Sequence, residues 1–192
     1  AQCLVGSEMC IRDRFLTCGV AFSQTLALKA NIGVCACWDA VGLNVYEVFG
    51  LKVGTFSMIM HTVCVLVQLV IQRKAFRAWK FLQIPYVVLF GTFLNFFYYD
   101  VLTCELNSYL IKVVFVVLAY LGLALFLGPL LLLNLVNMPS EAMCVVISGN
   151  YEVDYAKVRI GLDAVCVIAS VILSLAGGVS VKVREGTVIG ML

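Results

Sequence analysis

Charged residues are scarce in this sequence. Asp, Glu, Lys and Arg make up 12% of its 192 residues, against about 25% in a soluble domain. Hydrophobic residues make up 63%, against about 45–50% in a soluble domain. Because so few polar side chains cannot cover the surface of a soluble fold, the composition indicates an integral membrane protein. At roughly 20 residues a span, the length suits one bundle of about five or six spans.

The residues that most enzymes and metal sites need are also scarce. There is one histidine, His61, and no GxSxG, HExxH or phosphate-binding loop, so we expect no enzyme and no cofactor. Ser57 lies one helical turn before His61, but a serine–histidine pair without a third group is a weak signal. The nine cysteines are mostly scattered through apolar runs, and the lone CxC at Cys35 and Cys37 predicts no metal site. The net charge of +2 and the lack of a basic stripe predict no nucleic-acid partner.

Six apolar segments are predicted to cross the membrane, at about 15–30, 54–72, 81–99, 109–136, 158–175 and from 183 onward. The first and last are short, as spans truncated at the ends of a fragment would be. The fourth is long enough to span with tilt or with a break near Gly128–Pro129. Residues 1–14 do not join smoothly to the rest, so we expect an artefact or a disordered tail there and a single membrane domain over 15–192.

Two polar interruptions, "NIGVCACWDAVGLNVYEVFG" and "NMPSEAMCVVISGNYEVDYAKVR", break the apolar pattern. The first is predicted to contain an amphipathic helix too short and too polar to cross a bilayer, and the second to contain a short apolar helix. In the first, Gly50 is a plausible stop signal. In the second, Pro139 suits the first helical turn. Such an interruption either dips into the membrane as a re-entrant element or rests at the interface, and the sequence leaves both alternatives open.

The two interruptions occupy matching places in an internal repeat. A shift of roughly 102 residues puts Asp39 on Glu141 and His61 on Asp163. The order span, short helix, span, span then occurs twice, over about 15–107 and about 108–192. Because three spans is an odd number, the two halves must face opposite ways. We therefore expect an all-α polytopic membrane bundle of about six spans, built as two inverted three-span repeats that each carry a short amphipathic or re-entrant helix.

Ionisable groups inside predicted spans are candidates for a functional site, because burying them in a bilayer is costly. His61 lies about two turns into the second span, and Asp163 occupies the corresponding place in the fifth. One hypothesis is that these positions approach each other near the midplane and line a polar path for a solute. The alternative is that His61 donates one hydrogen bond within the bundle and does nothing more. Arg159, four residues before Asp163, can pair with it along the helix, and that pairing would neutralise Asp163.

The first interruption supplies further candidates. If it is re-entrant, Asn31 and Asp39 should face a cavity along the solute path. If it is interfacial, Trp38 should anchor the short helix in the headgroup region. Other polar residues within spans are adequately explained by hydrogen bonds between helices, and these are Gln24, Gln68 and Asn95.

The segment "ALKANIGVCACWDAVGLNVYEVFGLKVGTFSMI" resembles the signature of bacterial YczE/YitT-type membrane proteins. Members of that group typically read "KANIG…PWD" followed by a helix and "GTWS". This chain keeps "KANIG", "WD" and "GT", and it has Cys37 where the pattern has proline. The resemblance covers about 15–192. It implies a bacterial polytopic membrane protein without a settled activity, and it supplies no catalytic residue.

The basic cluster that follows the second span should be cytoplasmic by the positive-inside rule. We therefore expect a multi-pass protein of the bacterial cytoplasmic (inner) membrane with its amino terminus in the cytoplasm. The expected function is transport or export of a small solute or ion through a site between the two repeats. The alternative is a non-transporting accessory or scaffold protein of the membrane. The expected partners are the lipid bilayer and that small solute or ion.

Overall fold

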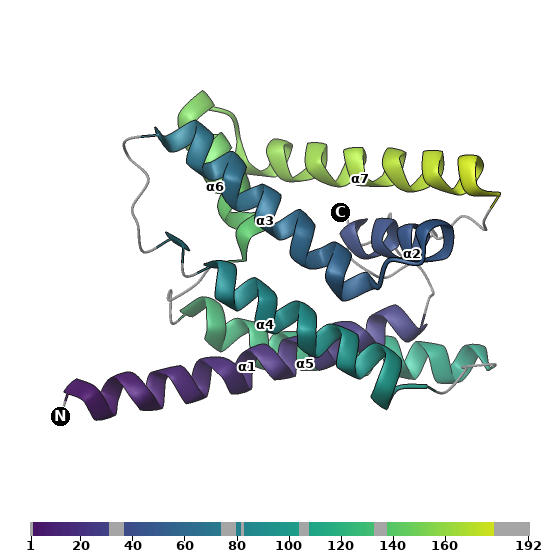
Figure 1. The fold of residues 1–192 in the computed structure, drawn as a ribbon, viewed down its shortest axis with the longest axis horizontal. Helices are drawn as coiled ribbons and strands as arrows, with labels where there is room; N and C mark the ends of the chain where they lie inside the picture. The colour runs from purple at the N-terminus through teal and green to yellow at the C-terminus, as the bar shows by residue number, and fades with distance from the viewer. Residues whose placement is uncertain are drawn as a thin grey trace.

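The computed structural model describes residues 2–30, 37–73, 80–81, 83–103, 108–132 and 138–178. This part of the chain contains helices and no strand, so the predicted all-α class is confirmed. The elements in chain order are α1 (Gln2–Ala30), α2 (Cys37–Phe49), α3 (Val53–Gln72), α4 (Gln83–Asn95), the π-helix η3 (Phe96–Val101), α5 (Tyr109–Leu132), α6 (Pro139–Tyr151) and α7 (Tyr155–Gly177) (Figure 1).

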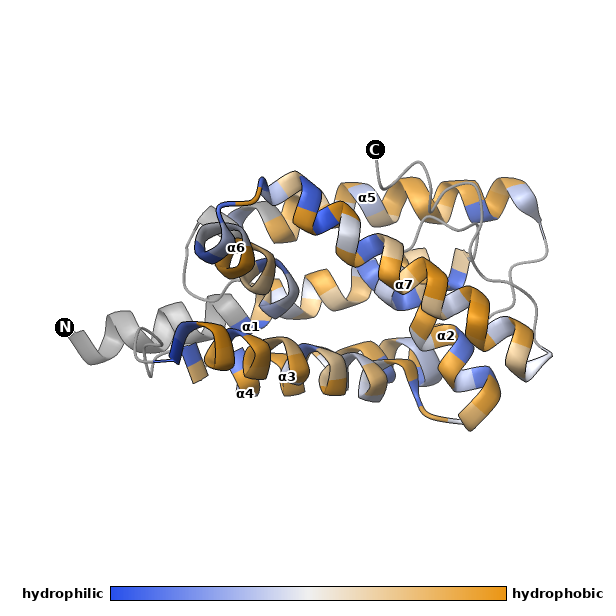
Figure 2. Ribbon diagram, turned by 90° about the horizontal axis from the view of Figure 1, so that it is seen from above, coloured by the Kyte–Doolittle hydropathy of each residue, from blue (hydrophilic) through white to orange (hydrophobic). Residues whose placement is uncertain are grey.

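Four helical segments of the described chain are long and apolar enough to cross a membrane. They are α3, α4 together with η3, the stretch 109–127 of α5, and α7. Hydrophobic residues predominate along α3, α4 and α5 in Figure 2. Many large apolar side chains of the four spanning segments are exposed, including Leu66 on α3, Leu121 on α5 and Leu175 on α7. Lipid tails can cover such surfaces without the penalty that water would impose, so the fold is that of a polytopic membrane protein.

The count of six spans is reached only in part. α1 is not among the four spanning segments, and charged residues, Arg14 and Lys29, bound its apolar part. Residues 2–14, which the sequence sets apart, continue the same helix as the segment predicted at 15–30. The last predicted span, from 183 onward, lies outside the described residues.

The short helices begin and end where local sequence signals predict. Gly50 follows α2 with a φ of 70°, a left-handed conformation that glycine adopts without steric cost. Pro139 is in the first turn of α6, where its missing N–H leaves no helical hydrogen bond unmade. In α5 the helix continues through Pro129 to Leu132, so the structure has no break at Gly128–Pro129.

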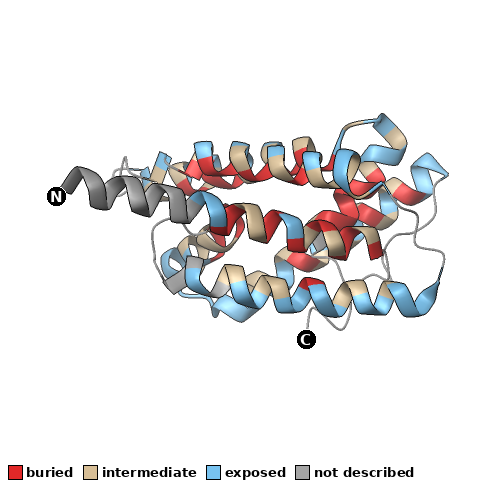
Figure 3. Ribbon diagram, turned by 90° about the horizontal axis from the view of Figure 1, so that it is seen from below, coloured by how far each residue is buried: buried red, intermediate tan, exposed pale blue. Residues whose placement is uncertain are grey.

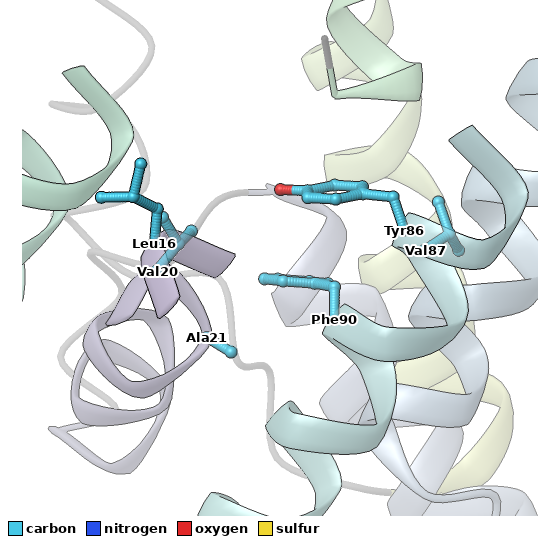
Figure 4. Close-up of a cluster of buried hydrophobic side chains, with 6 residues drawn as sticks. All are labelled: Leu16, Val20, Ala21, Tyr86, Val87 and Phe90. Carbon is cyan, nitrogen blue, oxygen red and sulfur yellow. The ribbon is translucent and has the colours of Figure 1, made fainter. Parts of the chain in front are cut away.

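The helices pack in two layers, with α1, α4 and α5 in one and α2, α3, α6 and α7 in the other (Figure 1). α1 packs along α5, and the chain runs in opposite directions through the two helices. Buried residues face the interior, whereas the outer faces are exposed (Figure 3). One buried cluster joins α1 to α4 and contains Leu16, Val20, Ala21, Tyr86, Val87 and Phe90 (Figure 4).

α3 and α4 approach closely at two glycines. A Cβ atom on Gly91 would lie 2.7 Å from the carbonyl oxygen of Gly54, and one on Gly54 would collide with Gly91. Asn95 closes the contact, because its Oδ1 accepts a hydrogen bond from the Gly54 N–H at 2.9 Å. Its Nδ2 donates to Thr55 Oγ1 at 3.2 Å. Small residues at such a crossing let the backbones meet, as is common between membrane helices.

α2 and α6 have the same length and matching surroundings. Each has 13 residues, and α6 begins at Pro139, 102 residues after α2 begins at Cys37. α7 likewise begins at Tyr155, 102 residues after α3 begins at Val53. α2 packs against α7 and α3, and α6 packs against α3 and α7. In Figure 1 the two short helices lie toward opposite ends of the bundle.

Candidate functional site

A cavity of about 170 Å³ lies inside the bundle. A water needs on the order of 10–15 Å³ of such volume, so the cavity has room for roughly ten waters or for a small solute. Its walls include side chains from all seven α-helices. The polar and charged residues that line it, apart from a tyrosine on α5, are Gln24, Asp39, His61, Ser140, Glu141 and Arg159. Two of these, Asp39 and Glu141, lie in the first turns of α2 and α6, so both short helices begin at the cavity.

Asp39 is held by a neutral partner rather than by a cation. Its side chain is only 5% exposed, and Gln24 Nε2 on α1 donates to both carboxylate oxygens, at 2.8 and 3.0 Å. Within the described ranges, no Lys, Arg or His nitrogen lies within ion-pair distance of Asp39. A buried charge without a counter-charge is costly, so this setting favours the neutral acid. Burial raises the pKa of the Asp39 carboxyl to about 7, and the Gln24 hydrogen bond acts in the opposite direction and lowers it.

His61 lies near the middle of α3, and hydrogen bonds within that helix fix its ring. Its Nδ1 is 2.8 Å from the Ser57 carbonyl oxygen and 3.1 Å from Ser57 Oγ. A carbonyl oxygen can only accept, so Nδ1 must carry the proton. Nε2 is therefore the ring nitrogen that can accept from a ligand. The same proton prevents Nδ1 from acting as the base for the Ser57 hydroxyl, which removes the geometry that a serine–histidine nucleophile would need.

The predicted pairing of Arg159 with Asp163 is present. Arg159 Nε lies 3.5 Å from Asp163 Oδ2 along α7. Asp163 is 7% exposed and does not line the cavity, whereas Arg159 does. Of the two residues predicted to meet at the midplane, His61 therefore lines the cavity. Asp163 does not line it, but it is paired with Arg159, which does.

Trp38 lines the cavity beside Asp39 and also packs against a buried cluster between α2 and α7. A smaller void of about 10 Å³, room for one water, lies between α2 and α3 and is bordered by Trp38, Asp39, Ser57 and His61. The indole Nε1 of Trp38 is buried, and no acceptor for it lies within the described part of the chain. Asn31, the remaining candidate, lies outside the described residues.

Gln24 and Glu141 are two of the cavity residues that were not among the predicted site residues. Gln24 was expected to make only an interhelical hydrogen bond, and its partner is the Asp39 carboxylate. Glu141 had a usable signal, because the 102-residue shift aligns it with Asp39. No group of three or more His, Cys, Asp or Glu side chains in the described ranges is placed to hold a metal ion.

Polar contacts tie each short helix to a span in the other half of the chain. Asn44 Nδ2 on α2 donates to the Ser170 carbonyl oxygen at 2.9 Å and to Ser170 Oγ at 2.7 Å on α7. Gln68 Nε2 on α3 donates to the carbonyl oxygen of Pro139, at the start of α6, at 3.1 Å. Ser170 follows Gln68 by 102 residues. These hydrogen bonds hold α2 against α7 and the start of α6 against α3.

The fold and the cavity define a polytopic, all-helical membrane protein whose interior cavity carries polar and charged side chains among apolar ones. Residues 15–192 match the model of a family of unknown function, DUF6198, and the chain belongs to that family. No curated protein and no solved structure matches the chain.

Proposed function

We propose that this protein carries a small polar solute or ion across the membrane through the cavity between its two halves. The observation that carries the proposal is the cavity itself, which the first turns of α2 and α6 line together with His61 and Arg159. The bundle around it turns apolar side chains outward. Polar and charged groups inside such a bundle are expensive, and a solute pathway accounts for their presence.

The proposal includes two inverted repeats, in which α1, α2 and α3 correspond to α5, α6 and α7. The opposite directions of α1 and α5 support it, as do the positions of α2 and α6 toward opposite ends of the bundle. If each helix is replaced by its counterpart in the other repeat, the packing of α2 on α7 becomes the packing of α6 on α3. Both contacts occur in the structure. Transporters built from inverted repeats bind their cargo near the midplane, between the repeats.

The geometry favours the re-entrant alternative for α2 over the interfacial one. The first turn of α2 reaches the cavity near the middle of α3, where His61 lies, and its last turn leads directly into the start of α3. A helix that begins in the interior points its unpaired N–H groups and its positive dipole end at the cavity. α6 begins at the same cavity, so both short helices present the groups with which half-helices contact a solute.

The finer assignments belong to the same proposal. They are the YczE/YitT-type resemblance, the bacterial inner membrane as the location, and an amino terminus in the cytoplasm. The "KANIG", "WD" and "GT" matches support the first of them. The basic residues after α3 support the orientation by the positive-inside rule.

The test is to obstruct the cavity and measure flux. Ala119 on α5 is 1% exposed and lines the cavity, so Ala119→Phe should fill part of it. Ala124, on the same helix, is exposed, and Ala124→Phe is the matched control. Proteoliposomes would be challenged with gradients of urea, glycine, acetate and ammonium salts, and volume changes followed by stopped-flow light scattering. We expect at least one solute to enter faster than into protein-free vesicles, and Ala119→Phe but not Ala124→Phe to abolish the difference.

Only preparations that elute as a single species in size-exclusion chromatography would be compared, since a misfolded Ala119→Phe protein would also lose flux. Flux equal to that of protein-free vesicles for every solute, with another membrane protein co-purifying, would contradict transport and favour the accessory function.

A further inference from the structure

Asp39 is placed so that it can be either protonated or ionised without rearrangement. As a carboxylate, it accepts both hydrogen bonds from Gln24 Nε2. As a neutral acid, it can keep one of those bonds on its carbonyl oxygen and turn its O–H toward the cavity that it lines. A neutral amide partner suits both states, whereas an arginine or lysine partner would hold the carboxyl ionised.

The rest of the cavity wall does not fix the charge of Asp39. The titratable or charged groups that line the cavity from the other helices are His61 on α3, Tyr120 on α5, Glu141 on α6 and Arg159 on α7. The one cation that is charged at all relevant pH values, Arg159, is paired with Asp163. Glu141 adds a second carboxyl group to the cavity wall and no cation.

We propose that Asp39 binds and releases a proton from the cavity, so that H⁺ is a ligand of the transport site and sets the charge that a solute meets there. On release, the carboxyl O–H bond breaks, the proton passes to a water in the cavity, and the carboxylate stays hydrogen-bonded to Gln24. This inference rests on the proposed function for its role in transport. The proton exchange itself can be measured without any solute.

The test is infrared pH-difference spectroscopy of the full chain in lipid vesicles, recorded across the pH range on both sides of the Asp39 pKa. A protonated carboxyl absorbs apart from a carboxylate, so its loss is observed directly. We expect the wild type to lose a protonated-carboxyl band with a midpoint near pH 7, and Asp39→Asn to lack that band. Asp154→Asn is the matched control, since Asp154 is an exposed aspartate that caps α7. It should behave as the wild type does.

A second variant guards against a folding defect in Asp39→Asn. Gln24→Met removes the amide but keeps the length of the side chain, and the Gln24 hydrogen bond favours the charged carboxyl. We expect the band to persist in Gln24→Met and its midpoint to move to higher pH. A titrating band that survives in Asp39→Asn, or the absence of any such band from the wild type, would overturn the inference.

The failure of this inference is distinguishable from the failure of the proposed function. Flux in the vesicle assay without an Asp39 titration would overturn the proton site and leave transport standing. An Asp39 titration without flux of any of the solutes tested would support the proton site and count against transport.

Discussion

At the scale of single residues, the important groups are polar side chains whose partners lie far away in the sequence. Asp39 is paired with Gln24 across the gap between α1 and α2, and Asn44 with Ser170 across the two halves. Each of these pairs is buried or nearly so, and each replaces hydrogen bonds that water would otherwise supply. Their burial makes them sensitive to changes of charge that an exposed residue would tolerate.

The raised pKa of Asp39 predicts how stability depends on pH. The folded-state pKa is about 7, above the ordinary value of 3.8, so the native state binds the proton more tightly than the unfolded state does. The resulting stabilisation is fully present below the ordinary value and is lost as the pH rises through about 7. Asp39→Asn resembles the protonated acid at every pH. We therefore compare the melting temperatures of Asp39→Asn and the wild type in detergent. The difference between them, in favour of Asp39→Asn, should be several degrees larger above pH 7 than at acidic pH.

Intrinsic-fluorescence melting curves at a series of pH values would measure this. For Asp154→Asn, at an exposed position, the difference in melting temperature from the wild type should not grow as the pH rises. A gap between Asp39→Asn and wild type that is constant over the whole range would contradict the raised pKa.

At the scale of elements, the crossing of α3 and α4 depends on the absence of side chains at two positions. Gly54 and Gly91 face each other where the backbones are closest, and Asn95 hydrogen-bonds across the crossing. Glycine ordinarily weakens a helix relative to alanine. Its presence here reflects the close approach of the two helices, which a β-carbon would prevent.

Gly91→Ala should therefore destabilise the protein although alanine is the better helix former. The added methyl group would meet the Gly54 carbonyl oxygen and the Met58 side chain, and such overpacking costs about 1–3 kcal/mol. Gly161→Ala on α7 is the matched control, because a Cβ at Gly161 meets nothing within 4 Å. It should leave stability unchanged or raise it by up to about 1 kcal/mol. Thermal melting in detergent would check both, and equal effects of the two substitutions would rule out a close crossing.

At the scale of the whole molecule, the equal spacing of the two sets of helices is the main organising feature. α2 and α3 start 102 residues before α6 and α7. The short helices lie toward opposite ends of the bundle and begin at one shared cavity. In the transporter that we propose, such an arrangement would offer a solute similar surroundings from either side of the membrane.

The proposed inversion predicts that equivalent residues of the two halves face opposite sides of the membrane. Lys52, before α3, and Lys157, in the first turn of α7, are both exposed. Single cysteines at these lysines, in a protein whose native cysteines are replaced, should react with an impermeant maleimide from opposite sides. With the amino terminus in the cytoplasm, the residue at 52 should label from outside and that at 157 from inside. Labelling of both from one side in oriented vesicles would refute the inversion.

The sequence by itself determined the class of fold and most helix boundaries. Long apolar runs fix where the chain can lie in a membrane, because only helices satisfy their own backbone hydrogen bonds there. Local signals at Gly50 and Pro139 fixed the ends of the short helices. Sequence patterns also selected His61 within a span, Asp39 within the first polar interruption and Arg159 as the neighbour of Asp163. All three line the cavity.

Only the tertiary structure decided which polar groups face one another. Gln24 lies 15 residues from Asp39 and on another helix, and no sequence spacing states which way each helix turns. The same holds for Asp163, which was predicted to line the path and instead lies outside the cavity lining, paired with Arg159. Periodicity fixes which residues share a helix face, but the partner of that face depends on how helices distant in the chain pack together.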